Sequence, residues 1–439
     1  MSDPATSETS PASLDGTLAT RRIVLGITGG IAAYKAAELC RLLVKAGATV
    51  RVVMTEAATR FITPLTLQTL SGAPVSTDLF DSGSEAEIGH IRLADEADLL
   101  IVAPATADAI ARLAAGMAND LLTAVVLATR APVLLAPAMN VNMWENPLTQ
   151  ANLERLLGAG GGGRITSVGP DQGPLACGWI GAGRLIEPVE IAAAAIRLLA
   201  PGDLDGQRVV VTAGPTREPV DDVRFLGNRS SGKMGAALAA SAAARGARVT
   251  LLAGPGTPAI PGRGGPIEIE RIEVETAADL ERALATATPS ADAVVMTAAV
   301  ADFRPRTRAS GKLSRRAATG VALELTPVPD LLAGVARARQ NGRPFLIGFA
   351  AEIGGGAAME TRAADKLRDK GCDAIVANDV SAAGIGFGAD DNAVTVLFAD
   401  GARVAIPRAS KREVADQLWH LFAPRLPPKA KGKETAGHA

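Results

Sequence analysis

The feature that most constrains the fold is a succession of apolar runs, glycine-containing turns and helical stretches that occurs twice. In the first half of the 439 residues the apolar runs are 22–27, 49–54, 98–103 and 132–136. The second half repeats the arrangement with the runs 208–212, 248–252, 293–297, 344–349 and 373–377. Such continuous apolar strands are typical of a parallel sheet covered by helices on both faces. The sequence therefore predicts an α/β protein with two doubly wound parallel-sheet domains.

Helices are expected directly after the first strand of each half, over 32–46 and from about Gly232. A turn-rich break at 200–206 (APGDLDG) separates two expected domains, 21–200 and 205–424. The two ends, 1–20 and 425–439, are polar, and the first lacks the basic start and apolar stretch of a signal peptide. We expect both ends to be disordered tails.

Charge, hydropathy and cysteine content narrow the function. The formal net charge of −1 disfavours a general nucleic-acid binder, which usually carries a basic excess. No apolar run approaches the roughly 18 residues that cross a bilayer. The three cysteines, Cys40, Cys177 and Cys372, form neither a disulfide framework nor a metal knuckle. We therefore expect a protein of the reducing cytoplasm without nucleic-acid or membrane partners.

The segment 26–35 (GITGGIAAYK) joins the first strand to its helix and is suited to an anion. Its glycines allow close backbone approach, the helix start offers free N–H groups, and Thr28 adds a hydroxyl. A tight turn or a site for another phosphate explains the loop equally well. The second strand ends at Met54-Thr55 and not at an acidic residue, which disfavours NAD and favours a mononucleotide such as FMN.

Three further residues of the first half have useful chemistry and a plain structural alternative. His90 suits a general base, although a lone histidine is more often structural. Asn140 follows a strand, where it can hold a carboxylate or bond its own turn. Cys177 lies in the glycine–proline loop 169–178, which is costly to order without a ligand, and its thiol is either accessible or inert.

Taken together, five motifs in the first half resemble the flavin-dependent cysteine decarboxylases, in particular those that act on phosphopantothenoylcysteine. The motifs are GITGGIAAYK, HIRLA, APATADAIARLAAGMANDLL, PAMNVNMW and GPLACG. The resemblance implies a flavodoxin-like domain in which His90 is the base, Asn140 grips the substrate carboxylate and Cys177 donates a proton. It also implies bound FMN, with contacts from Thr28, Gly29, Gly30, Ile31, Thr55 and Thr106.

The implied chemistry explains why a flavin is needed. An ordinary amino-acid carboxylate does not lose CO₂, because the carbanion has nowhere to place its charge. Oxidation of the cysteine thiol to a thioaldehyde supplies an electron sink, and the enethiol left after decarboxylation is then reduced. That reduction requires a proton donor, the role assigned to Cys177.

In the second half, a polar nest that suits phosphates lies where a helix is expected to begin. It consists of Ser230, Ser231, Gly232 and Lys233. The spacing is not that of a Walker loop, and a Rossmann NAD site is the alternative. Asp302 follows a buried strand. The next stretch, 304–316, holds six basic residues and is either a solvated loop or a lid over a triphosphate.

Residues 205–422 resemble the phosphopantothenate–cysteine ligases, which implies a Rossmann-like domain in which Asn228 and Lys312 act on an acyl-nucleotide intermediate. The bacterial bifunctional members use CTP, and Mg²⁺ is expected with it. Lys366 and Lys370 stand one helical turn apart and can address the same phosphates. Besides the nest, the implied CTP contacts are Met296, Thr297, Ala298, Asp302, Lys312, Pro329, Asp330, Leu331, Leu332, Phe349, Lys366 and Lys370.

Two departures from the ligase pattern stand out. The lysine-rich lid motif K-x-K-K is Lys312-Leu-Ser-Arg here, so serine and arginine occupy its third and fourth positions. Val328 stands where an asparagine is common. Charge in the lid is largely preserved, so ligase activity is expected.

The two resemblances together imply consecutive steps of coenzyme A biosynthesis. CTP would activate 4'-phosphopantothenate, cysteine would displace CMP, and the product would then be decarboxylated. The family also implies a homo-oligomer, a dodecamer of decarboxylase trimers with ligase dimers. A non-enzymatic flavoprotein that regulates a partner is the alternative, which the presence of Asn140 and Cys177 disfavours.

Overall fold

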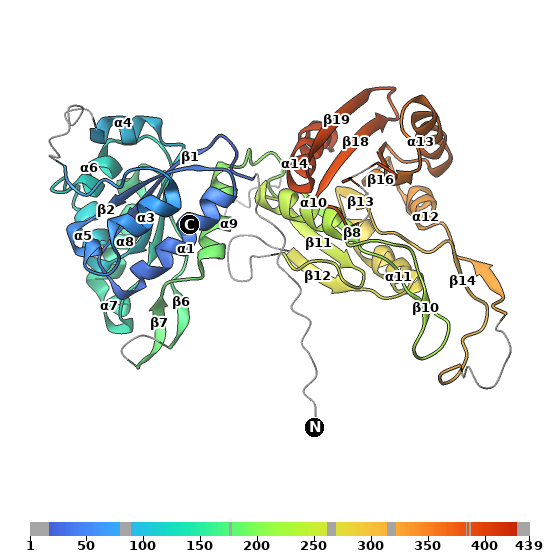
Figure 1. Ribbon diagram of the computed structural model, residues 1–439, viewed down its shortest axis with the longest axis horizontal. Helices are drawn as coiled ribbons and strands as arrows, with labels where there is room; N and C mark the ends of the chain where they lie inside the picture. The colour runs from blue at the N-terminus through green and yellow to red at the C-terminus, as the bar shows by residue number, and fades with distance from the viewer. Residues whose placement is uncertain are drawn as a thin grey trace, which may run out of the picture. The chain divides into compact units, whose positions relative to one another are not determined.

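The computed structural model describes residues 17–79, 89–174, 178–260, 269–313, 322–382, 384–385 and 388–427 (Figure 1). The chain forms two compact units and passes from one to the other between Pro201 and Gly202. Some residues assigned to the tails by the sequence analysis are packed: Leu18 and Leu426 are both buried. Among the described residues, no helix is long and apolar enough to cross a membrane.

The N-terminal unit is a five-stranded parallel sheet in the order β2-β1-β3-β4-β5. This is the flavodoxin order, in agreement with the prediction. Its strands are β1 (Arg22–Ile27), β2 (Thr49–Met54), β3 (Leu99–Ala105), β4 (Val133–Pro137) and β5 (Ile165–Ser167). Its helices are η1 (Ile31–Tyr34), α1 (Lys35–Lys45), α2 (Glu56–Thr59), α3 (Pro64–Ser71), α4 (Gly89–Glu96), α5 (Ala107–Ala114), α6 (Leu121–Ala128), α7 (Val141–Glu145), α8 (Pro147–Leu157), η3 (Ala159–Gly161) and α9 (Pro188–Leu199).

Two details of this unit differ from the sequence prediction. The helix expected over 32–46 starts with the 3₁₀ turn η1 and becomes α-helical only at Lys35. The glycine–proline segment, expected to be a loop, belongs to an antiparallel hairpin of β6 (Asp171–Pro174) and β7 (Ile180–Arg184). Pairing with β7 satisfies backbone groups of residues 171–174, so this part of the segment is ordered without a ligand.

The C-terminal unit is built on an eight-stranded sheet in the order β12-β11-β8-β13-β16-β17-β18-β19. Pairs from β12 to β17 are parallel, but β18 pairs antiparallel with both neighbours. The prediction of a parallel sheet is therefore wrong at this edge. The strands are β8 (Arg208–Ala213), β11 (Arg248–Ala253), β12 (Ile269–Glu273), β13 (Ala293–Met296), β16 (Phe345–Glu352), β17 (Ala374–Asp379), β18 (Asp391–Phe398) and β19 (Arg403–Ser410).

The antiparallel edge has a simple cause in the chain. Only residues 399–402 separate β18 from β19, and Gly401 adopts a φ of 88° in that turn. A parallel pair would need a crossover of a dozen or more residues. Two short ribbons lie outside the sheet, β9 (Glu218–Pro219) with β10 (Phe225–Leu226), and β14 (Phe303–Pro305) with β15 (Leu325–Pro327).

Helices cover both faces of this sheet. One face carries α11 (Ala277–Ala287), α12 (Leu331–Ala338) and α13 (Ala357–Lys370), whose buried side chains form one core with Val210, Val294 and Leu346. On the other side α10 (Lys233–Ala244) packs on β8, and α14 (Lys411–Phe422) packs on α10. The Trp419 indole N–H donates to the Leu238 carbonyl over 3.0 Å, which fixes α14 against α10. Two 3₁₀ turns, η4 (Thr288–Ser290) and η5 (Ala423–Arg425), extend α11 and α14.

Gly235 sets how closely α10 approaches the sheet, and we expect Gly235→Ala to destabilise this unit by about 1–3 kcal/mol. A Cβ at this position would lie 2.5 Å from the Ala213 Cβ and 2.5 Å from the Thr297 hydroxyl. Urea unfolding measures the effect. Gly334→Ala on α12 is the matched control, because a Cβ there meets nothing within 4 Å. Equal stability of the two variants would contradict this account.

Candidate functional sites

The first candidate site lies at the carboxyl ends of the strands in the N-terminal unit. Thr28 directly follows β1, and its hydroxyl donates to the Pro104 carbonyl over 2.7 Å. Thr106 follows β3, and its backbone N–H donates to the Thr28 hydroxyl over 3.2 Å. Thr55 follows β2 and donates its N–H to Ile27 over 3.0 Å. The structure thus brings these three threonines to one edge of the sheet.

This edge coincides with the point where the strand order reverses. The switch lies between β1 and β3, whose ends carry Thr28 and Thr106. Open α/β sheets bind their ligands in the crevice at such a point. Gly29 lies directly on α2, because a Cβ there would be 2.4 Å from the Ala57 Cβ. Gly30 is extended and precedes η1, and Ile31 is 62% exposed.

Asn140 lies close to this edge, after β4, and caps α7. Its side-chain oxygen accepts the Asn142 N–H over 2.9 Å, so the turn-forming role foreseen as an alternative is present. The β6–β7 hairpin packs against it: the Met139 N–H donates to the Gly183 carbonyl over 2.9 Å. The close approach requires Gly183, because a Cβ there would lie 2.4 Å from the Met139 oxygen. This contact anchors β7 beside Asn140.

The two remaining predicted residues of this site are Cys177 and His90. Cys177 lies outside the described residues. His90 is the second residue of α4 and is half-buried, and no hydrogen bond within the described part of the chain joins it to the threonines. Lys35, at the start of α1, pairs with Glu187 over 3.0 Å. The hydrogen bond from Lys35 holds the pKa of Glu187 below its ordinary value and ties α1 to the segment after β7.

The second candidate site is a pocket of about 840 Å³ in the C-terminal unit. It opens at the carboxyl ends of β13, β16 and β17, beside the switch in strand order between β8 and β13. Asn228 and every predicted nucleotide contact except Lys312 line it. They are Asn228, Ser230, Ser231, Gly232, Lys233, Met296, Thr297, Ala298, Asp302, Pro329, Asp330, Leu331, Leu332, Phe349, Lys366 and Lys370.

The polar nest has the conformation that an anion site requires. Gly232 caps α10 with a φ of 67°, and no side chain caps the helix start. A Cβ on Gly232 would lie 2.9 Å from the Thr257 Cα, so a glycine is required on two grounds. Asn228 is fixed by its amide, which donates to the Val300 carbonyl over 2.8 Å.

The three predicted lysines of the pocket are paired with carboxylates. Lys366 lies 2.7 Å from Glu352, Lys233 lies 2.6 Å from Asp390, and Lys370 pairs with Asp330. The hydrogen bond from Lys233 holds the pKa of Asp390 below its ordinary value. For Asp330, burial is the largest influence and opposes ionisation, but the hydrogen bonds from Lys370 and the Ala333 N–H and the nearby positive charges together lower the pKa. A polyanion that enters must exchange these ion pairs for its own.

Lys312 is placed elsewhere. It is exposed, and its neighbours are tied to the turn at 221–224: the Gly311 N–H donates to Asp222 over 3.0 Å, and the Leu313 N–H to Asp221 over 3.1 Å. The part of the expected lid that the structure describes is therefore a docked ribbon and not a freely solvated loop. Residues 314–321, with Ser314 and Arg315, lie outside the described residues.

One lining residue was missed by the sequence analysis. Lys411 is the first residue of α14, and its ammonium donates to the Ala389 carbonyl at the edge of the pocket. Burial lowers the pKa of Lys411 below its ordinary value, and the charge of Lys233 lowers it further. A positive charge at a helix N-terminus is unfavourable because it opposes the helix dipole. This unusual position of Lys411 is the sequence feature that could have identified it.

Comparison with known proteins covers both units. Residues 11–199 match the family described as "Flavoprotein", and residues 204–424 match the "DNA/pantothenate metabolism flavoprotein C-terminal domain". The "Coenzyme A biosynthesis bifunctional protein CoaBC" of Vibrio cholerae is 49% identical over 92% of this chain and 98% of its own length. The protein of the same description from Bacillus subtilis is 45% identical over 92% of this chain and 97% of its own length. A solved C-terminal domain of a protein so described covers 51% of this chain and 97% of itself, with 35% identity and a TM-score of 0.41.

Proposed function

Because the chain belongs to the family of bifunctional proteins of coenzyme A biosynthesis and is a phosphopantothenate–cysteine ligase and phosphopantothenoylcysteine decarboxylase, we propose how its residues divide the two reactions. The C-terminal unit ligates first, with CTP as the nucleotide. The N-terminal unit then decarboxylates the product. The observation that carries this division is the assembly of Asn228, the nest and the paired lysines in one pocket.

In the ligase the chain mainly positions anions and offsets their charge. The nest binds a phosphate through the uncapped N–H groups of α10, and Lys366 and Lys370 face the triphosphate after releasing Glu352 and Asp330. Asn228, held by Val300, orients the acyl phosphate for attack by the cysteine amine. The phosphopantothenate carboxylate gains the cytidylyl group as pyrophosphate leaves, and the amine then displaces CMP.

Mg²⁺ would enter this pocket with the nucleotide. Among the described residues, no three His, Cys, Asp or Glu side chains cluster to hold a metal ion. This fits Mg²⁺, which typically keeps several waters and binds through substrate phosphates.

The crevice between β1 and β3 fits FMN. Thr28, Thr55 and Thr106 fix the ends of β1, β2 and β3 around it through hydrogen bonds of their own. At Gly30 a Cβ would meet only the Thr106 methyl group, at 3.6 Å, so the backbone there is open to an approaching phosphate. FMN supplies the two-electron oxidation and reduction when bound. Asn140 would hold the substrate carboxylate, His90 would accept a proton, and Cys177 would return one to the enethiol. Each of these roles requires the residue to reach the same crevice.

A direct assay tests both halves of the proposal. Purified protein should be yellow from bound flavin and should release pyrophosphate from phosphopantothenate and CTP in a single turnover. It should release CMP, and turn over repeatedly, only when cysteine is also present. It should also release CO₂ from phosphopantothenoylcysteine supplied without CTP. No pyrophosphate release from phosphopantothenate and CTP, or CO₂ release that requires CTP, would refute the division of labour between the units.

We also propose that the protein works in the cytoplasm as a homo-oligomer of decarboxylase trimers and ligase dimers. Large apolar side chains of the N-terminal unit are exposed, among them Leu65 at 69%, Leu148 at 76% and Ile180 at 81%. Contiguous exposed apolar surface is typical of interaction sites. A flavin-loaded monomer in analytical ultracentrifugation would rule this assembly out.

Nucleotide binding should take up protons at alkaline pH because of Lys411. Its pKa is lowered in the free protein, and a nearby triphosphate raises it again. At an alkaline pH between the lowered and the restored pKa, binding must therefore draw protons from the solvent. Calorimetry of CTP binding in buffers of different ionisation enthalpy measures the uptake. Lys411→Met should reduce it and Lys45→Met should not; unchanged uptake in Lys411→Met would contradict the assignment.

A further inference from the structure

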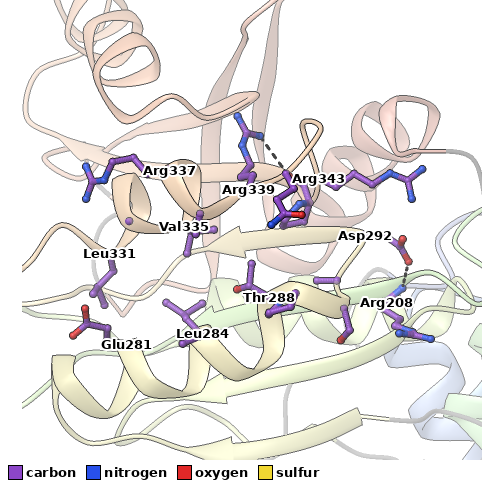
Figure 2. A pocket seen from close by; sticks show the side chains of 18 of the residues that line it. Arg208, Glu281, Leu284, Thr288, Asp292, Leu331, Val335, Arg337, Arg339 and Arg343 are labelled. Atoms are coloured by element: carbon purple, nitrogen blue, oxygen red, sulfur yellow. Dashed lines mark hydrogen bonds between the residues drawn. The ribbon is translucent and has the colours of Figure 1, made fainter.

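A second cavity of the C-terminal unit, of about 700 Å³, lies between α11 and α12. Figure 2 shows Leu331 and Val335 of α12 above Leu284 of α11, with the cavity along the two helices. All three side chains are buried. One end of the cavity reaches Arg208 and Asp292, where β8 and β13 begin, and these amino ends face away from the nucleotide pocket. A cavity of this size, with both apolar and charged side chains around it, is typical of a small-molecule site.

Gly334 keeps this groove open. It lies inside α12, where a glycine costs about 1 kcal/mol of stability relative to alanine. Helical glycines of this kind usually allow close packing, as Gly235 does. Here, however, a Cβ would meet no heavy atom within 4 Å. The missing side chain therefore leaves space instead of allowing contact.

Thr288 places an unsatisfied hydroxyl beside the groove. The residue is 9% exposed, and its side-chain oxygen has no hydrogen-bond partner among the described residues. A buried hydroxyl without a partner is costly, and a threonine at a helix end ordinarily bonds a carbonyl of the preceding turn. Figure 2 shows this oxygen on the side of Val335 and Leu284. The oxygen itself is enclosed, so Thr288 marks imperfect packing between the two helices at this groove and is not a contact for the ligand.

The charges at the groove favour an anion. Arg339 is engaged by Asp373 at 2.5 Å, and Asp330 by Lys370. The other charged lining residues are the guanidinium groups of Arg208, Arg337 and Arg343 and the carboxylates of Glu281 and Asp292. Arg337 is exposed and makes no ion pair or hydrogen bond with the described part of the chain. The charge of Arg337 is therefore available to an anion in the groove.

We propose that the groove binds a small organic acid with an aliphatic body, and that its occupancy alters nucleotide binding. The acid group would meet Arg337 and the body would lie on Leu284 and Val335. The second part of the proposal rests on the proposed function of the neighbouring pocket. Helix α12 connects the two sites, because Pro329, Asp330 and Leu331 line both.

The connection runs through Asp330. One oxygen of its carboxylate caps α12 by accepting the Ala333 N–H over 3.0 Å, and the other pairs with Lys370 in the nucleotide pocket. A ligand that shifts α12 therefore changes how firmly Lys370 is held. Coupling between sites is reciprocal, so nucleotide must change the affinity of the acid by the same factor.

Octanoate is a suitable probe, titrated against the full-length protein by ligand-observed NMR without nucleotide. We expect one site per chain with a dissociation constant of the order of a millimolar, and no comparable binding of acetate. Gly334→Leu, which fills the groove, should weaken binding at least about tenfold, whereas Gly334→Ala should not. Arg337→Gln should also weaken it, while Arg368→Gln on α13 serves as the charge control. Unchanged octanoate affinity in Gly334→Leu would overturn the site.

The coupling is tested separately by the affinity for CTP with and without saturating octanoate. A change of about fivefold or more is expected in the wild-type protein and none in Gly334→Leu. An unchanged CTP affinity would refute the coupling. Because octanoate binding is measured without nucleotide, its failure is distinct from a failure of ligase activity, which pyrophosphate release reports.

Discussion

Asn228→Ala is expected to abolish ligation and to leave decarboxylation intact. The side chain is fixed at the mouth of the pocket by its 2.8 Å bond to the Val300 carbonyl, so it is positioned before the substrate arrives. Loss of one preorganised polar group that faces developing charge typically costs about 10²–10³ in turnover. Pyrophosphate release in the presence of phosphopantothenate, CTP and cysteine measures the loss.

The chain itself supplies the control for this variant. CO₂ release from added phosphopantothenoylcysteine reports the N-terminal unit and should be unchanged. Asn341→Gly is the matched substitution, because Asn341 is exposed and adopts a φ of 52°, which glycine tolerates. Ligation at a normal rate in Asn228→Ala would exclude the role assigned to this amide.

Cys177→Ser is expected to stop the second reaction after CO₂ has left. The serine hydroxyl is a far weaker proton donor than a thiol, so the enethiol should not be reduced. We expect the product to be lighter than 4'-phosphopantetheine by two hydrogen atoms, and the reduced product to fall by at least about 10²-fold. Mass spectrometry of a single turnover distinguishes the two products.

Cys40→Ala is the control for the loss of a thiol. Cys40 is fully buried in α1, and burial raises its pKa to about 11, so it is not a proton donor at neutral pH. Cys372 is similar, with a pKa raised to about 11 mainly by burial. If Cys177→Ser forms the reduced product at the normal rate, the proton comes from elsewhere.

The sequence predicted the parts of the fold that depend on local pattern. The first strand of each half is confirmed at 22–27 and 208–213, because an apolar run that ends in a glycine turn has few other uses in an α/β chain. The antiparallel pair β18–β19 was missed, although its four-residue turn excludes a crossover helix. The hairpin at 171–184 was missed as well, since glycine and proline were interpreted only as loop formers.

The site residues also form two groups: those whose place follows from the end of a strand, and those placed only by tertiary packing. Those that end a strand or directly follow one, such as Met296, Thr28 and Thr106, lie at one edge of their sheet, because parallel strands end together. Lys411 lies far from the other pocket residues in the sequence and reaches them only through the packing of α14 on α10. Lys312 is separated from the pocket by the ribbon contacts of Asp221 and Asp222. Such tertiary placements have no local signature.

The position of α14 also determines when the ligase can become active during synthesis. Lys411 begins this helix at the pocket, and Trp419 and Phe422, both fully buried, hold it to the body of the domain. Domains generally fold in the order in which they are made, so the decarboxylase half can mature while the ligase half is still incomplete. The nucleotide pocket is closed only once the last helix has left the ribosome. A chain truncated before residue 411 would therefore retain the second reaction of the pathway while lacking the first.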